Sequence, residues 1–194
     1  MAGGVKWWHW AGAGVLLYLF YPRRFGKPLP DAHVSGGWGD PRPASVGHYH
    51  YAIDLPAPTG TPIYSAQGGT VVAADAVGGT SAGKYVVVKQ GETATRYLHM
   101  SQVMVTKGDR VSRGTLLGLV GSTGLSAGPH LHLDVFLSGA KLAAFKKRYG
   151  TPNPPYPSPR QWGTQVPAET LIPVDSYAAR VRSAAAERGV TLLG

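Results

Sequence analysis

The stretch Leu131-His132-Leu133-Asp134-Val135-Phe136 alternates apolar and polar side chains along most of its length. In an extended chain every second side chain points to the same face. The pattern therefore predicts a β-strand with one face in a hydrophobic core. We expect this strand to close an all-β core that begins near residue 55.

Short segments of strand-forming residues precede it, separated by turns such as Gly78 to Gly83 and Gln90-Gly91-Glu92. Valine, isoleucine, tyrosine and threonine, which favour extended structure, recur in these segments. No stretch between them has a long 3.6-residue periodicity. The segments are residues 63–66, 70–74, 84–89, 93–99, 103–105 and 116–120. They predict a mainly β fold, built as a sandwich or a barrel.

The flanking segments differ from this core in composition, so we divide the chain into residues 1–30, 31–140 and 141–194. Residues 141–148 are basic and predict one or two helical turns. Five prolines between Thr151 and Pro159 predict an extended linker or a strap laid over the domain. A short C-terminal helix is expected over residues 175–188, because helix start and stop residues flank it.

Residues 7–21 form an apolar run with aromatic residues at both ends, which predicts an N-terminal hydrophobic helix. A helix of this length spans about 22 Å, against about 30 Å for the hydrocarbon core of a bilayer. Arg23, Arg24 and Lys27 follow the run and Lys6 precedes it, a bias that favours a cytoplasmic C-terminal side. Three interpretations stay open: a membrane anchor, a signal sequence, or a segment that docks into a larger assembly such as a phage particle.

The length of 194 residues suits one domain with extensions. The absence of cysteine excludes disulfides, thiolate zinc sites and a cysteine nucleophile, so any metal must be bound by histidine or carboxylate side chains. A formal net charge of +9 attracts the chain to polyanions such as nucleic acid, anionic lipid or an anionic cell wall. No arginine-rich helix or aromatic stacking motif is present, so we do not expect a nucleic-acid partner.

Two pairs of residues indicate a metal site. His50 and Asp54 are four residues apart and His130 and His132 are two apart, so each pair shares one face of an extended strand. Two imidazoles and one carboxylate form the ligand set of open catalytic zinc sites, which leave a fourth position for water. Either pair alone occurs often by chance. Their combination with the glycine-rich residues 121–128 is more specific.

These residues resemble the signature of the lysostaphin-like (LytM-type) zinc metalloendopeptidases, which cut peptidoglycan cross-bridges. That signature is His-x-Gly-x-Asp, then Tyr-x-His at the end of a central strand, then Gly-Pro-His-Leu-His. The corresponding stretches here are His50-Tyr51-Ala52-Ile53-Asp54, Tyr97-Leu98-His99 and Gly128-Pro129-His130-Leu131-His132. The resemblance extends over residues 34–137, roughly half of the chain.

The resemblance implies an antiparallel β architecture with the site in a groove. It implies one Zn²⁺ bound by His50, Asp54 and His132. It also implies two catalytic histidines, His99 and His130, which orient or deprotonate the attacking water or stabilise the oxyanion. The implied reaction is zinc-dependent hydrolysis of peptide cross-links in bacterial peptidoglycan, for cell wall lysis or remodelling.

The resemblance further implies a location in the cell envelope, the periplasm or outside the cell. Residues 1–24 would then contact a membrane, as an anchor, or a phage particle, as part of a virion-associated lysin. The charge bias around the apolar run conflicts with an anchored enzyme that faces the wall. Some members of the family have lost ligands, so a non-catalytic regulatory or structural module in a cell-envelope or phage assembly is the alternative. The presence of all five site residues argues against it.

Five other residues need separate interpretation. Ala52 stands where the family usually has glycine and is tolerated if its φ is negative. His48 is a substitute ligand, a substrate contact or an exposed strand residue. Asp134 either accepts a hydrogen bond from a metal ligand and so orients it, or is a solvated strand residue. Tyr97 is expected to pack rather than to catalyse, and Asp109 is expected to cap a turn.

Overall fold

The computed structural model describes residues 25–29, 31, 33–43, 49–149, 164–168 and 171. Most of the hydrophobic N-terminal segment, His48, the proline-rich stretch and the helix expected over residues 175–188 lie outside these residues. Within the described part of the chain, no helix is both long enough and apolar enough to cross a membrane.

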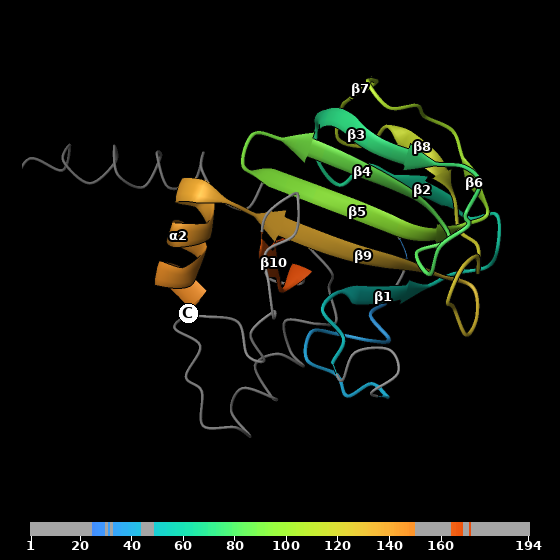
Figure 1. Cartoon of the computed structure of the whole chain (residues 1–194), viewed down its shortest axis with the longest axis horizontal. Helices are drawn as coiled ribbons and strands as arrows, with labels where there is room; N and C mark the ends of the chain where they lie inside the picture. The colour runs from blue at the N-terminus through green and yellow to red at the C-terminus, as the bar shows by residue number, and fades with distance from the viewer. Residues whose placement is uncertain are drawn as a thin grey trace, which may run out of the picture.

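The described residues form two antiparallel β-sheets (Figure 1). The larger sheet has seven strands, of which six run in the order β1-β9-β5-β4-β3-β7, and the seventh, β10, also pairs with β9. The smaller sheet has the order β2-β8-β6. The strands of the larger sheet are β1 (Ile53–Pro56), β3 (Gly69–Asp75), β4 (Lys84–Gln90), β5 (Thr93–Met100), β7 (Arg110–Val111), β9 (His130–Leu137) and β10 (Thr164–Val166). Those of the smaller sheet are β2 (Pro62–Tyr64), β6 (Gln102–Val103) and β8 (Leu116–Leu119).

A hydrophobic core fills the space between the two sheets. Ile63 of β2 and Leu117 of β8 share one buried cluster with Tyr97, Leu131 and Leu133 of the larger sheet. Tyr97 is fully buried, and its hydroxyl accepts a hydrogen bond from the backbone N–H of Ala66. The predicted mainly β antiparallel sandwich is thereby confirmed, and Tyr97 packs as expected.

Strand β9 has two different faces. Leu131, Leu133 and Val135 are buried in the core, while His132 and Asp134 lie on the opposite face. The alternation seen in the sequence therefore assigns this strand and its orientation correctly. The face that carries His132 is the one on which the candidate site forms.

Helix α2 (Gly139–Tyr149) follows β9 directly and is longer than the one or two turns expected from the sequence. Its first turn is capped from another element, because the carboxylate of Glu92 accepts hydrogen bonds from the N–H groups of Ala140 and Lys141. Phe145, near the middle of the helix, packs into the core. The cap comes from 48 residues upstream, so no local pattern in the sequence shows it.

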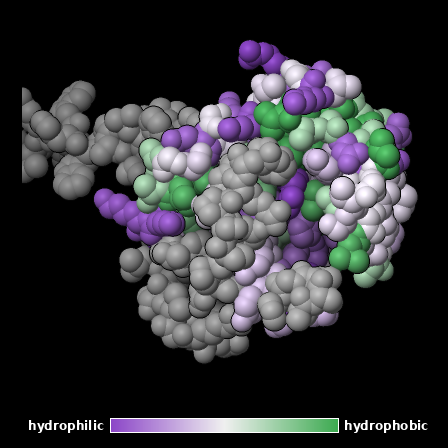
Figure 2. All heavy atoms as spheres, viewed as in Figure 1, coloured by the Kyte–Doolittle hydropathy of each residue, from purple (hydrophilic) through white to green (hydrophobic). Residues whose placement is uncertain are grey.

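Strand β10 belongs to the C-terminal segment but lies within the same sheet. It pairs with residues 135–137 of β9, on the edge where β1 pairs with residues 130–133 (Figure 1). Val166 and Ala168 are buried in the core. On the face shown in Figure 2, hydrophilic residues and smaller hydrophobic areas are interspersed over the described part of the surface.

Candidate metal centre

The pairing of β1 with β9 brings two of the predicted ligands together. Asp54 of β1 stands directly opposite His132 of β9, so their side chains lie on the same face of the sheet. His50 precedes β1, which begins at Ile53, and so does not share a strand with Asp54 as the sequence suggested. Its position is set by backbone hydrogen bonds to Gly39 and Asp40, at 2.7 and 2.8 Å.

Three donor atoms of these residues converge on one point. The distances are 3.1 Å from His50 Nε2 to His132 Nδ1, 2.9 Å from His132 Nδ1 to Asp54 Oδ1, and 3.2 Å from His50 Nε2 to Asp54 Oδ1. Ligand atoms of a tetrahedral zinc ion with bonds of 2.0–2.1 Å are about 3.3 Å apart. The three atoms therefore already have close to the spacing that one such ion requires, and the donor set fits the group.

The other nitrogen of each ring faces an acceptor. His50 Nδ1 lies 3.1 Å from the carbonyl oxygen of Gly37, and His132 Nε2 lies 3.4 Å from Asp134 Oδ1. A carbonyl or carboxylate oxygen only accepts, so each of these nitrogens carries a proton. His50 Nε2 and His132 Nδ1, which both face Asp54 Oδ1, are then the nitrogens that a metal would bind in place of a proton.

The Asp54 carboxylate is held by Arg42, which the sequence did not single out. Arg42 Nη2 donates to Oδ2 at 2.8 Å, which leaves Oδ1 directed at the two histidines. A side chain at Gly36 would lie 3.0 Å from both Arg42 Nη2 and Asp54 Oδ2, so the missing Cβ makes room for this ion pair. Burial alone would raise the pKa of Asp54, but hydrogen bonds from His132 and His50 and their charge hold it well below its ordinary value.

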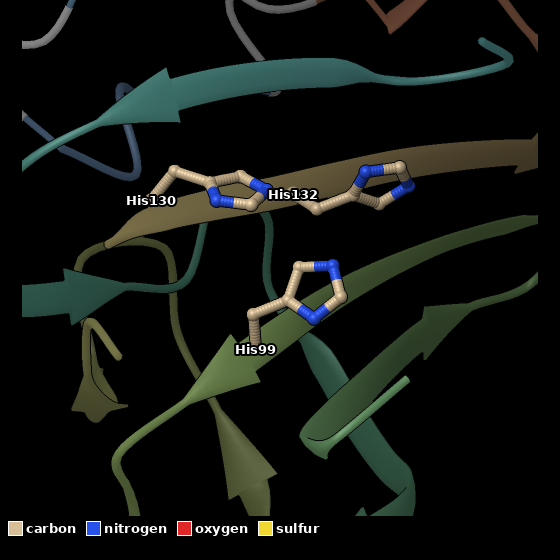
Figure 3. Close-up of side chains that lie close together, drawn as sticks. All are labelled: His99, His130 and His132. Atoms are coloured by element: carbon tan, nitrogen blue, oxygen red, sulfur yellow. The ribbon is translucent and has the colours of Figure 1, made fainter. Parts of the chain in front are cut away.

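The rings of His99 on β5 and of His130 on β9 lie beside that of His132 (Figure 3). Their ring centroids are 4.9 Å apart, and His130 Nε2 is 3.5 Å from Asp54 Oδ1. The Nδ1 atoms of His99 and His130 face the carbonyl oxygens of Thr123 and Gly128, at 2.9 and 2.8 Å. A carbonyl oxygen only accepts, so each Nδ1 carries a proton, and Nε2 is the nitrogen of each ring that stays available to other partners.

A β-bulge directs His99 into the site. Between two neighbouring pairs of the β4–β5 ladder, β5 has two residues, Leu98 and His99, where β4 has only Tyr85. Strict alternation would place His99 on the core face with Tyr97. Instead its φ is +63°, in the left-handed region, and its ring lies 5.6 Å from that of His132. Burial lowers the pKa of His99 to about 4, so the ring is neutral near pH 7.

The left-handed backbone at His99 gives a stability prediction. Replacing His99 with glycine is expected to leave a protein about 1 kcal/mol more stable than replacing it with alanine, because only glycine adopts a positive φ without strain. Both variants lose the imidazole, so the comparison isolates the backbone. Equilibrium urea unfolding of the metal-free protein measures the difference. The same pair of substitutions at Leu98 is the control, and there glycine should be the less stable. An alanine variant at residue 99 as stable as the glycine variant would contradict the strain.

Asp134 lies behind His132 and is buried, not solvated. Arg96 donates to its Oδ2 through Nε and Nη2, both at 2.6 Å. Burial alone would raise the pKa of Asp134, but the charges of Arg96 and His132 hold it well below its ordinary value. Burial alone would lower the pKa of His132, but the charge of Asp134 and hydrogen bonds to Asp134 and Asp54 raise it to about 9. A metal that binds His132 Nδ1 therefore has to displace a proton.

The structure resolves two of the remaining interpretations, those of Ala52 and Asp109. Ala52 is fully buried and is not among the described residues with positive φ, so its methyl group is accommodated without strain. Asp109 closes a turn as expected, because its carboxylate accepts hydrogen bonds from the N–H and hydroxyl of Thr106. His48 lies outside the described residues.

Comparison with known proteins agrees with this geometry. The profile of Peptidase family M23 matches residues 48–144, half of the chain. Peptidoglycan DD-endopeptidase ShyA of Vibrio cholerae serotype O1 is 44% identical over 98 residues, which are 50% of this chain and 22% of ShyA. The chain thus spans less than a quarter of the length of this relative.

Solved structures show the same fold. A zinc-containing peptidase from Vibrio cholerae is 32% identical with a TM-score of 0.54, over 60% of this chain and 37% of that one. The catalytic domain of lysostaphin from Staphylococcus simulans is 29% identical with a TM-score of 0.52, over 56% of this chain and 83% of that one. The resemblance inferred from the three sequence motifs is confirmed, and the chain belongs to peptidase family M23.

Proposed function

We propose that this protein is a zinc-dependent endopeptidase that hydrolyses peptide cross-links of bacterial peptidoglycan. One observation carries the proposal: Nε2 of His50, Oδ1 of Asp54 and Nδ1 of His132 lie within 3.2 Å of one another. Two further histidines, His99 and His130, lie beside the same three atoms. A structural histidine cluster would not require two imidazole nitrogens and a carboxylate oxygen at the spacing of zinc ligands.

We assign the metal to His50, Asp54 and His132. A second set, His99, His130 and His132, also has donor atoms close enough for one ion. The first set is favoured because its carboxylate offsets part of the charge of a dication, whereas the second set offers three neutral ligands. A zinc ion bound there lowers the pKa of a water molecule and polarises a carbonyl group.

His99 and His130 are then the proton-transfer groups. In the neutral form of each ring the lone pair is on Nε2, so each can accept a proton from water and return it to the leaving amine. Their Nδ1 protons are fixed on backbone carbonyl oxygens, which prevents the rings from presenting the wrong nitrogen.

Peptidoglycan is proposed as the substrate because of the relatives. ShyA is named for DD-endopeptidase activity on peptidoglycan, and ALE-1 of Staphylococcus capitis, 38% identical over 102 residues, is named a glycyl-glycine endopeptidase. The two names specify different peptide bonds, so the bond cleaved here is left open. The net charge of +9 favours approach to an anionic wall. A location in the cell envelope or outside the cell follows, with residues 1–24 as the proposed contact to a membrane or a phage particle.

The test is hydrolysis of purified peptidoglycan sacculi by the full chain. We expect new free amino groups to appear without new reducing ends, because a peptide bond and not a glycosidic bond is cut. Removal of zinc with a chelator should stop the reaction, and added zinc should restore it. Hydrolysis that is indifferent to the chelator would refute a metal-dependent mechanism. Stoichiometric zinc and sacculus binding without cleavage would instead identify a non-catalytic binding module.

A further inference from the structure

The support behind His132 involves a residue that lies 33 positions further along the chain. Gln165 of β10 donates from Nε2 to Asp134 Oδ1 at 2.5 Å, the same oxygen that faces His132 Nε2 at 3.4 Å. A carboxylate accepts and cannot donate, so the amide nitrogen and not its oxygen must face Asp134. The contact therefore ties the C-terminal strand to the back of the candidate metal ligand.

Arg96 does not fix the Asp134 carboxylate by itself. Its two short contacts with Asp134, from Nε and Nη2, both end on Oδ2. Two bonds to one oxygen leave the carboxylate free to turn about that oxygen, and the terminal torsion of an aspartate side chain has broad minima. The hydrogen bond from Gln165 holds Oδ1, and with it the orientation of the oxygen that His132 faces.

Gln165 also reaches the segment that carries His50. Its Nε2 lies 3.3 Å from the carbonyl oxygen of Tyr51, next to His50 in the chain. One amide group thus contacts both segments that supply the candidate ligands. Strand β10 holds it there by pairing with β9, with Gln165 opposite Phe136.

The amide is retained at a cost. Gln165 is 3% exposed, and its Oε1 is buried without a hydrogen-bond partner in the described part of the chain. A buried acceptor without a partner is unfavourable, and a leucine or methionine of similar size would avoid it. The two Nε2 hydrogen bonds are what an apolar residue at this position could not supply.

We propose that Gln165 is a positioning residue of the metal centre, which orients His132 through Asp134, so that strand β10 is part of the functional unit. This inference rests on the proposed metal site. It makes Gln165 a determinant of metal affinity and of the geometry around the metal, although its hydrogen bonds go to Asp134 and Tyr51 and not to a ligand. Loss of an outer contact of this kind typically weakens metal binding about 10–100-fold.

The experiment compares the full chain with Gln165→Leu and Gln165→Met, which remove the donors but differ in shape, so that a folding defect in one leaves the other usable. The matched control is Thr164→Ala, on the same strand but on its opposite face. Zinc affinity is measured by competition with a chelating dye, and the cobalt-substituted proteins are compared by their visible spectra. We expect both Gln165 variants to bind zinc at least about 10-fold more weakly and to have altered cobalt spectra. Thr164→Ala should match the wild type.

Unchanged zinc affinity and an unchanged cobalt spectrum in both Gln165 variants would overturn the inference. If the wild type bound no zinc, the proposed function would fail first. NMR of the metal-free proteins then still decides the positioning role. A slowly exchanging Nε2 proton of His132 in the wild type and in Thr164→Ala, lost in both Gln165 variants, would support it. The same slow exchange in all four proteins would overturn it.

Discussion

Replacing His132 with alanine is expected to remove both zinc binding and hydrolysis, whereas replacing His130 with alanine should remove hydrolysis alone. In the first variant, bound zinc falls below stoichiometry and activity falls to background. In the second, zinc stays bound and kcat falls about 10²–10⁴-fold, the usual contribution of a proton-transfer group. The two residues are two positions apart on one strand, so a difference between the variants reports which ring binds the metal and not where the substitution lies in the fold.

The contrast follows from the different contacts of the two rings. His132 Nδ1 is 2.9 Å from Asp54 Oδ1 and 3.1 Å from His50 Nε2, so its loss leaves two ligand atoms in place of three. His130 Nε2 approaches Asp54 Oδ1 only to 3.5 Å, and its ring is held on the carbonyl of Gly128. Its removal therefore leaves the three-atom set intact.

Metal analysis after dialysis and steady-state kinetics on sacculi make the two measurements. His33→Ala is the control, since His33 is exposed and belongs to neither candidate metal group of the described residues. Retention of stoichiometric zinc by His132→Ala, or its loss from His130→Ala, would show that the ligand assignment is wrong. Full activity of His130→Ala would remove that residue from the proton-transfer step.

The sequence was sufficient for the parts of the site that lie within local patterns. The alternation over residues 131–136 predicted the strand that carries His132, and pairing of β1 with β9 then brings Asp54 opposite it. The orientation of His99 was not predictable by the same reasoning. Alternation along β5 directs it to the core, and only the bulge, a property of the β4–β5 ladder, turns it to the site.

The residues that hold the site and the helix in place could not be predicted from the sequence, for a different reason. Arg42, Glu92 and Gln165 act on partners 12, 48 and 31 residues away, and no periodicity or motif connects such positions. Each is a polar residue that satisfies a buried or partly buried group, which a single sequence shows only as an isolated polar side chain. Asp134 illustrates the limit: its place on the strand was predictable, but its burial beneath His132 depends on Arg96 and on a strand from beyond the proline-rich segment.

Replacing Arg96 with methionine is expected to destabilise the metal-free protein by about 3 kcal/mol, because it removes both short charged hydrogen bonds of the buried Asp134 carboxylate and leaves only His132 to balance its charge. Arg96 is mostly buried, with 15% of its side chain exposed, and both of its hydrogen bonds to Asp134 are 2.6 Å long. Arg110→Met is the control. Arg110 is exposed on β7, and its replacement should change the free energy of unfolding by no more than about 0.5 kcal/mol. Equilibrium urea unfolding gives both values.

The double variant Arg96→Met, Asp134→Leu separates stability from function. Replacing a buried ion pair with apolar residues of similar size is often neutral, so the double variant should recover most of the stability that Arg96→Met loses. Its zinc affinity should nevertheless stay low, because His132 Nε2 no longer faces a carboxylate. A double variant as unstable as Arg96→Met would show that packing, and not an uncompensated charge, causes the loss. Recovery of both stability and zinc affinity would show that Asp134 supports the fold and not the metal centre.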